Sequence, residues 1–166
     1  MSKTINKLSL TLPSDLEIRL EREFDAPRDL VFLAMSKEEH LKRWWGPPCV
    51  QMISCSVDFR VGGKYRFESR DEQGMIHPFT GEYLEIDAPE RMVFTQIYDL
   101  EPYNQFPATM TVTLEDLGGR TRYVGVIRHL VKEARDGHVG AGMEAGASAS
   151  YDQLESLLQE LKTQKD

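Results

Sequence analysis

Six consecutive β-strand segments in the middle of the sequence constrain the fold more than any other feature. They are predicted over residues 50–59, 64–69, 79–86, 91–98, 109–117 and 120–130, with short turn segments between them. Met110, Val112 and Leu114 alternate with threonines, which is the period of a strand with one buried face. Strands that follow one another through short turns favour antiparallel pairing. The segment therefore predicts a large antiparallel sheet.

A strand and two short helices are predicted before this block. Residues 15–24 alternate apolar and polar side chains, which indicates a half-buried strand. Pro27 suits the first position of a helix, and apolar residues recur at helical spacing after it. Ser36 and Glu39 have the spacing of a capping box, so a second short helix is expected to begin there and to end at Gly46.

The last third of the sequence changes its apolar period from two to about 3.6. From Met143 to Leu161, apolar residues recur every three or four positions, which predicts an amphipathic helix of about twenty residues. The fold class is therefore α+β, a curved antiparallel β-sheet around a long C-terminal helix, in the order β-α-α-β6-α. Residues 1–14 are interpreted as an N-terminal extension and residues 15–163 as a single domain.

Glycine and alanine dominate the first half of the helical region, which is taken to include residues 137–149. Gly137, Gly140, Gly142 and Gly146 lie there, and each glycine inside a helix costs about 1 kcal/mol relative to alanine. Two explanations are open. Either the backbone packs tightly against the sheet, or the missing side chains leave room for a bound molecule.

The acidic charge balance argues against one class of partner. The formal net charge is −7, so a phosphate backbone would on average be repelled, and nucleic acid is not an expected partner. The sequence has no run of about 18 apolar residues, so membrane insertion is not expected either. Because the N-terminus shows no signal-peptide pattern, a cytoplasmic location is the default expectation.

The cysteines and histidines do not form a recognisable motif. Cys49 and Cys55 lie in one predicted strand, roughly 20 Å apart by the rise per residue, so they cannot bridge each other. We expect both thiols to be buried or half-buried. The four histidines are scattered along the chain as His40, His77, His129 and His138. No metal site and no cofactor are expected on this basis.

Six short blocks of sequence, in order along the chain, form a distinctive set. They are REFDAPRDLVF (22–32), HLKRWWGP (40–47), DFRVGG (58–63), PFTGEY (78–83), APERMVFT (88–95) and GMEAG (142–146). Together they resemble the START-like (SRPBCC) superfamily, and within it the group named after the activator of the 90-kDa heat-shock protein ATPase. The resemblance implies a helix-grip (Bet v-like) fold. Members of the group often carry tryptophan directly after the last block, where this chain has Ala147. Its pocket is therefore expected to be larger or differently shaped.

An apolar pocket is expected between the sheet and the C-terminal helix. The residues expected to line it are Trp44, Trp45, Phe67, His77, Phe79, Phe94, Gln96, Tyr98, Met110, Val112, Met143, Ala147 and Tyr151. Of the two tryptophans, one ring is expected in the core and the other nearer the pocket, and the choice between them is open.

Three charged or titratable residues have two interpretations each. Arg22 shares the inward parity of its strand, and a structural role is favoured over a contact to a ligand carboxylate. For His77, a place on a hairpin is favoured over proton transfer, because no carboxylate or nucleophile lies at a diagnostic spacing. Glu144 is off the most apolar stripe of its helix, so a surface or structural role is favoured over a ligand contact. No catalytic residue is expected.

Binding of a small, mainly hydrophobic or aromatic molecule is the favoured function, and catalysis is less favoured. One alternative is an enzyme of the polyketide cyclase or aromatase kind that uses the same pocket. The other, implied only by the family name, is a co-chaperone of a heat-shock ATPase. A chaperone partner is not expected, because the sequence shows no distinctive exposed aromatic or basic patch. Exposed sheet edges are compatible with a homodimer.

Overall fold

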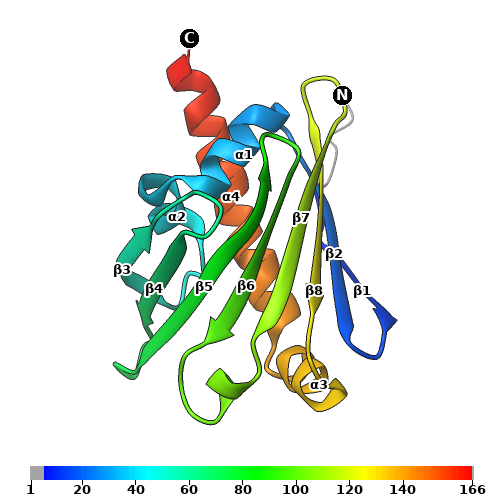
Figure 1. The fold of residues 1–166 in the computed structure, drawn as a ribbon. Helices are drawn as coiled ribbons and strands as arrows, with labels where there is room; N and C mark the ends of the chain where they lie inside the picture. The colour runs from blue at the N-terminus through cyan, green and yellow to red at the C-terminus, as the bar shows by residue number, and fades with distance from the viewer. Residues whose placement is uncertain (1–5, 166) are drawn as a thin grey trace.

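Eight antiparallel strands form one curved sheet (Figure 1). The computed structural model describes residues 6–165. The strands are β1 (Ser9–Ser14), β2 (Glu17–Phe24), β3 (Gln51–Val57), β4 (Lys64–Arg70), β5 (Ile76–Asp87), β6 (Arg91–Tyr98), β7 (Ala108–Asp116) and β8 (Thr121–Arg128). Their order across the sheet is β1-β2-β8-β7-β6-β5-β4-β3. Because β2 pairs with β8, the N-terminal strands lie beside the last strand of the chain.

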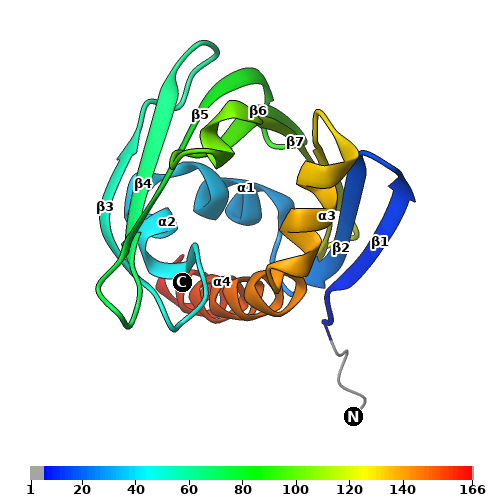
Figure 2. The ribbon, with the colours of Figure 1, turned by 90° about the horizontal axis from the view of Figure 1, so that it is seen from below.

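The helices lie on the concave side of this sheet. They are α1 (Arg28–Ser36), α2 (Glu38–Trp44), α3 (Lys132–Gly140) and α4 (Met143–Lys165), with a 3-10 helix η1 (Tyr103–Gln105) between β6 and β7. Figure 2 shows the sheet curving around α1 and α2, while α4 closes the remaining side. Among the described residues, no helix combines the length and hydropathy that a membrane crossing requires. The predicted α+β class and helix-grip arrangement are confirmed.

The hydrophobic core lies between the concave face of the sheet and α4. On β2, Ile18 and Phe24 are fully buried and Leu20 is 2% exposed, as the alternating pattern predicts. On α4, Leu154 and Leu158 are fully buried against them. Burial of each such side chain stabilises the fold by about 2 kcal/mol, so this contact anchors the helix on the sheet.

Two elements differ from the sequence prediction. The sequence assigns residues 1–14 to an extension, but β1 lies within them and pairs with β2 as an edge strand. Nearly all of its residues are exposed, so burial imposes little alternation that a sequence pattern could reveal. The C-terminal helical region is divided into α3 and α4, because Gly142 adopts a φ of +80°, which interrupts a helix.

The predicted capping box at Ser36 and Glu39 is wrong. Ser36 is the last residue of α1, and its hydroxyl donates to the Leu33 carbonyl at 3.3 Å. α2 begins at Glu38, and Lys37 before it makes no side-chain capping hydrogen bond. With a single residue between the two helices, Ser36 still belongs to α1 and cannot cap α2.

The two cysteines lie in different environments. Cys49 is exposed because it lies in the turn before β3, so the prediction that it is buried or half-buried is wrong. Cys55 is buried and free, as predicted. Burial, with Glu38 nearby, raises the pKa of the Cys55 thiol to about 11, so it stays protonated at neutral pH and is a poor nucleophile.

Candidate functional site

One part of the concave face is only partly covered by side chains. Trp45, Phe79 and Tyr98, near the start of β5 and the end of β6, and Phe94, midway along β6, are half-buried. The end where β5 begins and β6 finishes is the lower end in Figure 1. Elsewhere on the same face, Phe24 is fully buried. We call the four half-buried aromatic residues the aromatic patch. The patch is apolar surface that the fold itself leaves partly uncovered.

Strand register and ring contacts hold the aromatic patch together. Tyr98 on β6 pairs with Phe79 on β5, which pairs in turn with Phe67 on β4. The Tyr98 and Phe79 rings stack with their centroids 5.0 Å apart. The Trp45 ring lies 4.9 Å from Phe67 and 5.0 Å from Phe79. Neighbouring rings thus fix Trp45, Phe79 and Tyr98 relative to one another, whereas the Phe94 ring contacts Tyr65 and Tyr83.

The expected pocket residues divide into a buried and a half-buried group. The buried ones are Trp44, Phe67, Met110, Val112 and Tyr151. The half-buried ones are Trp45, His77, Phe79, Phe94, Gln96, Tyr98, Met143 and Ala147. Trp44 is the core tryptophan, since its indole N–H donates to the Ala34 carbonyl at 2.9 Å, and Trp45 is the one in the aromatic patch. Contact of either group with a ligand stays a prediction.

The glycines near the start of α4 do not pack against the sheet. A Cβ added at Gly137, Gly140, Gly142 or Gly146 would meet no heavy atom within 4 Å apart from its own chain neighbours and helix backbone. Tight backbone packing is therefore excluded as their explanation, and of these four glycines only Gly142 has a positive φ. Gly137, Gly140 and Gly142 are exposed, so the open space beside them is solvent, whereas Gly146 is half-buried. The second explanation, room for a bound molecule, stays a prediction.

A hollow of about 420 Å³ lies at the other end of the molecule. It is lined by Asp29, Leu30 and Leu33 of α1 and by Leu161 and Gln164 of α4. None of these residues belongs to the expected pocket set. The hollow opens to the surface, so it is a groove between two helices and is separate from the aromatic patch.

A chain of hydrogen bonds joins three side chains at the edge of the aromatic patch. The carboxylate of Asp71 lies 2.8 Å from Nε2 of His77, and Nδ1 of His77 lies 2.6 Å from the Tyr98 hydroxyl. The His77 bond lowers the pKa of Asp71, together with backbone N–H bonds from Met75 and Gln73. Burial raises the pKa of Tyr98, with further contributions from Tyr103 and Asp71. Asp71 is therefore ionised and Tyr98 neutral at neutral pH.

His77 lies on the β4–β5 hairpin, as favoured, but the sequence spacing did not reveal the carboxylate beside it. Asp71 lies at the end of β4 and His77 near the start of β5, so the hairpin between the two strands brings them together. Asp71 also accepts the backbone N–H groups of Gln73 and Met75, both at 2.9 Å. The sequence did contain a signal for this contact. It is an aspartate at the start of a tight turn, followed by a histidine at the start of the next strand.

The fold also brings two of the scattered histidines into contact. Nε2 of His129, at the end of β8, lies 3.0 Å from Nδ1 of His138 on α3. Burial, together with His129, lowers the pKa of His138 to about 4, and burial, together with Arg135, also lowers the pKa of His129. Among the described residues, no group of three or more side chains is placed to hold a metal ion. The pair therefore joins α3 to the sheet as two neutral rings.

Comparison with known proteins decides the family. Residues 25–159 match the family model described as Activator of Hsp90 ATPase homolog 1-like protein. The chain belongs to this family. None of the curated proteins is similar enough to count as a match.

Solved structures agree with this assignment to the AHSA1-like family. A protein of Nitrosomonas europaea is 28% identical, with a TM-score of 0.81 over 92% of this chain and 99% of its own. A protein of Arthrobacter aurescens is 26% identical, with a TM-score of 0.82 over 92% of this chain and 91% of its own. An AHSA1 protein of Silicibacter pomeroyi is 22% identical, with a TM-score of 0.73 over 86% and 97% of the two chains, and shows the shared fold.

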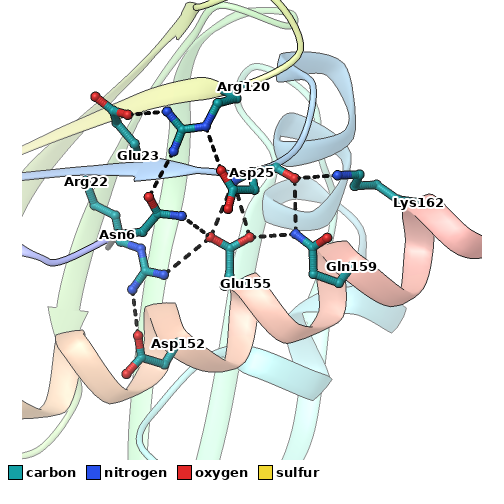
Figure 3. A network of polar contacts seen from close by, with 9 residues as sticks. All are labelled: Asn6, Arg22, Glu23, Asp25, Arg120, Asp152, Glu155, Gln159 and Lys162. Atoms are coloured by element: carbon teal, nitrogen blue, oxygen red, sulfur yellow. Dashed lines mark hydrogen bonds and ion pairs between the residues drawn. The ribbon is translucent and has the colours of Figure 1, made fainter. Parts of the chain in front are cut away.

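In this AHSA1-like chain, Arg22 takes part in a structural network between β2 and α4 (Figure 3). Arg22 is 4% exposed, and its guanidinium forms ion pairs with Asp152 at 2.7 Å and with Glu155 at 3.5 Å. It also lies 4.8 Å from the centre of the Phe24 ring. The structural ion pair favoured for Arg22 is confirmed.

Glu155 is the centre of the same network. It accepts hydrogen bonds from the side-chain amides of Asn6 at 2.7 Å and Gln159 at 2.8 Å, and from the Asp25 backbone N–H at 3.3 Å. Arg120 extends the network to Asp25, at 2.6 Å (Figure 3). The first sequence block shared with the family therefore includes residues that fasten α4 to the sheet. Glu144, at the other end of α4, is exposed, so its favoured surface position is confirmed.

Proposed function

We propose that this protein binds a small, mainly apolar molecule against the aromatic patch. The observation that carries the proposal is the half-burial of Trp45, Phe79, Phe94 and Tyr98 on a face where Phe24, Met110 and Val112 are buried. Apolar surface releases about 25 cal/mol per Å² when it leaves water, so a ligand that covers these rings gains affinity from each of them. Preformed sites lined by aromatic side chains are typical of small-molecule binding.

The start of α4 supports the same location. Ala147 is half-buried and packs against the core, and the neighbouring Gly146 has open space where a side chain would project. Members of the family often carry tryptophan at the position of Ala147. A methyl group in place of an indole leaves room for a guest, so Ala147 is expected to set the size of the site.

Native mass spectrometry of the purified protein, before and after denaturation, tests for a small molecule that copurifies. Thermal-shift measurements across fatty acids and aromatic compounds extend the test to added ligands. Ala147→Trp should fill the site and abolish binding, whereas Ala145→Trp, on an exposed position of the same helix, should retain it. An empty protein with no thermal shift for any compound would reject the proposal. Far-UV circular dichroism of both variants checks that they fold.

One observation favours the alternative, an enzyme of the polyketide cyclase kind. Asp71, His77 and Tyr98 form a continuous hydrogen-bonded chain that can move a proton to or from a bound molecule. Turnover of an aromatic polyketide that is lost in His77→Gln and retained in Glu144→Gln would support this alternative. Unchanged turnover in His77→Gln would remove its basis.

A further inference from the structure

The Tyr98 hydroxyl is the end of the hydrogen-bonded chain nearest the aromatic patch. Its ring stacks on Phe79 at 5.0 Å and lies 5.5 Å from Tyr103. Its hydroxyl contacts Nδ1 of His77, and Nε2 of the same ring contacts Asp71. Tyr98 is thus a polar group within the aromatic patch itself, and the direction of its hydrogen bond depends on His77 and Asp71.

The chemistry of Asp71 sets the direction of every hydrogen bond in this chain. An ionised carboxylate only accepts hydrogen bonds, so in the form of His77 that carries one ring proton, Nε2 holds that proton and donates it to Asp71. Nδ1 is then the accepting nitrogen, and the Tyr98 hydroxyl must donate to it. The single hydroxyl proton of Tyr98 is thus engaged in the hydrogen bond to His77. What the Tyr98 oxygen presents to the ligand site is a lone pair.

We propose that the site selects aromatic molecules that carry a hydroxyl group, with the ligand hydroxyl donating to the Tyr98 oxygen. This inference rests on the proposed function and names the ligand class. A hydroxyl ligand completes a chain in which each hydrogen bond points toward Asp71, and aligned bonds of this kind strengthen one another. An ether or ketone at the same place has no proton to donate, and its oxygen lone pairs are repelled by the lone pair of the Tyr98 oxygen. One neutral hydrogen bond contributes about 1 kcal/mol, which corresponds to about a fivefold difference in affinity.

Asp71→Asn offers a test because it should reverse the direction of the chain. The Asp71 oxygen that accepts the Gln73 and Met75 backbone N–H groups has to remain an oxygen in the variant. The new amide NH₂ then faces Nε2 of His77 and forces that nitrogen to accept. The His77 proton moves to Nδ1 and is donated to the Tyr98 oxygen. The Tyr98 hydroxyl proton becomes free for the ligand, and the site should now prefer acceptors.

The experiment compares 2-naphthol with 2-methoxynaphthalene by isothermal titration calorimetry at neutral pH. The ratio of the two affinities is compared among variants. The two probes differ in how strongly water rejects them, but this difference is the same for every variant and therefore cancels in the comparison. Relative to Tyr98→Phe, which lacks the hydroxyl, the wild type should favour the naphthol by about fivefold, and Asp71→Asn should favour the ether. ¹⁵N NMR of His77 should show a proton on Nε2 in the wild type and on Nδ1 in Asp71→Asn.

The possible failures are distinguishable. If both naphthalenes bind and the ratio is the same in all three proteins, the selection for hydroxyl groups is overturned while the proposed function stands. A wild-type His77 with a proton on Nδ1, either alone or together with one on Nε2, would also overturn it. If neither naphthalene binds to the wild type or to Tyr98→Phe, the selection for hydroxyl-bearing aromatic molecules is overturned. The proposed function falls with it only if the copurification and thermal-shift tests are negative as well.

Discussion

Gly81 lies on β5 at a point where three strands leave no room for a side chain. An added Cβ would lie 1.9 Å from the Thr95 carbonyl oxygen on β6 and 2.4 Å from the Tyr65 ring on β4. The Tyr65 hydroxyl donates to the same carbonyl at 2.7 Å, so the ring cannot move without losing that bond.

Gly81→Ala should therefore lower the free energy of unfolding by about 3 kcal/mol, because the backbone itself has to shift. Gly137→Ala is the matched control, since its new Cβ meets no neighbouring element. The control should raise stability by about 0.5–1 kcal/mol through better helix propensity. Urea unfolding of the two variants and the wild type measures both changes, and equal effects would contradict the prediction.

Glu155 and Glu160 are two glutamates on α4 with different surroundings. Glu155 is 19% exposed at its side chain, and all its partners are donors, among them Arg22. Glu160 forms an ion pair with Arg43 in which both side chains are about half exposed, at 52% and 47%.

Glu155→Gln should lower the free energy of unfolding by about 1–3 kcal/mol, because it removes a charge from buried Arg22 and turns an amide donor toward other donors. Glu160→Gln should change stability by less than about 1 kcal/mol, since exposed ion pairs are weak. Urea titration of each variant provides the comparison. A larger effect at Glu160 would mean that the network in Figure 3 is not a stabilising contact.

At the scale of elements, α3 is held to β8 by the neutral pair His129 and His138, and this contact should depend on pH. The pKa of His138 is lowered to about 4 in the folded protein, chiefly by burial, whereas an unfolded histidine has a pKa of about 6.5. The unfolded chain therefore binds more protons below pH 6.5. The stabilisation is complete above about pH 6.5 and is lost as the pH falls toward 4.

His138→Gln removes this titration. Between about pH 7 and 5, the wild type should lose roughly 2 kcal/mol more stability than His138→Gln. Urea unfolding at several pH values in that range gives the two slopes. Parallel slopes would show that His138 takes up its proton equally in the folded and unfolded states.

The sequence predicts the helices and strands whose one-sided burial gives a regular spacing of apolar residues. It misses the side-chain contacts that depend on how neighbouring strands are paired. The alternation at Met110 and Val112 and the stripe of leucines on α4 follow directly from burial on one side. The edge strand β1 is almost entirely exposed, so burial leaves little pattern in it. The aromatic patch is predictable by inward parity, but the bond between Asp71 and His77 depends on how the hairpin closes, which no local pattern encodes.

At the scale of the whole molecule, Leu158 connects the layers. It is fully buried on α4, within the single core cluster that includes residues of the sheet and of α1 and α2. Leu158→Ala should lower the free energy of unfolding by about 2–5 kcal/mol, whereas Leu130→Ala, at a residue 60% exposed, should change it by less than about 0.5 kcal/mol. Circular dichroism and the fluorescence of Trp44 and Trp45 should report the same urea midpoint. Separate midpoints would mean that the helices and the sheet unfold independently.

The pairing of β2 with β8 has a consequence during biosynthesis. Phe24 meets its partner Thr121 only after about a hundred further residues have been made. At roughly 5–20 residues per second, a ribosome needs on the order of 5–20 s for that stretch. Throughout this interval the nascent β2 has an unpaired edge on the side where β8 will add, and β1 alone can shield its other edge. During synthesis, β2 therefore remains without its β8 partner longer than any later strand remains without its neighbour. Its unpaired edge is the part of the nascent sheet that a nascent-chain chaperone would shield.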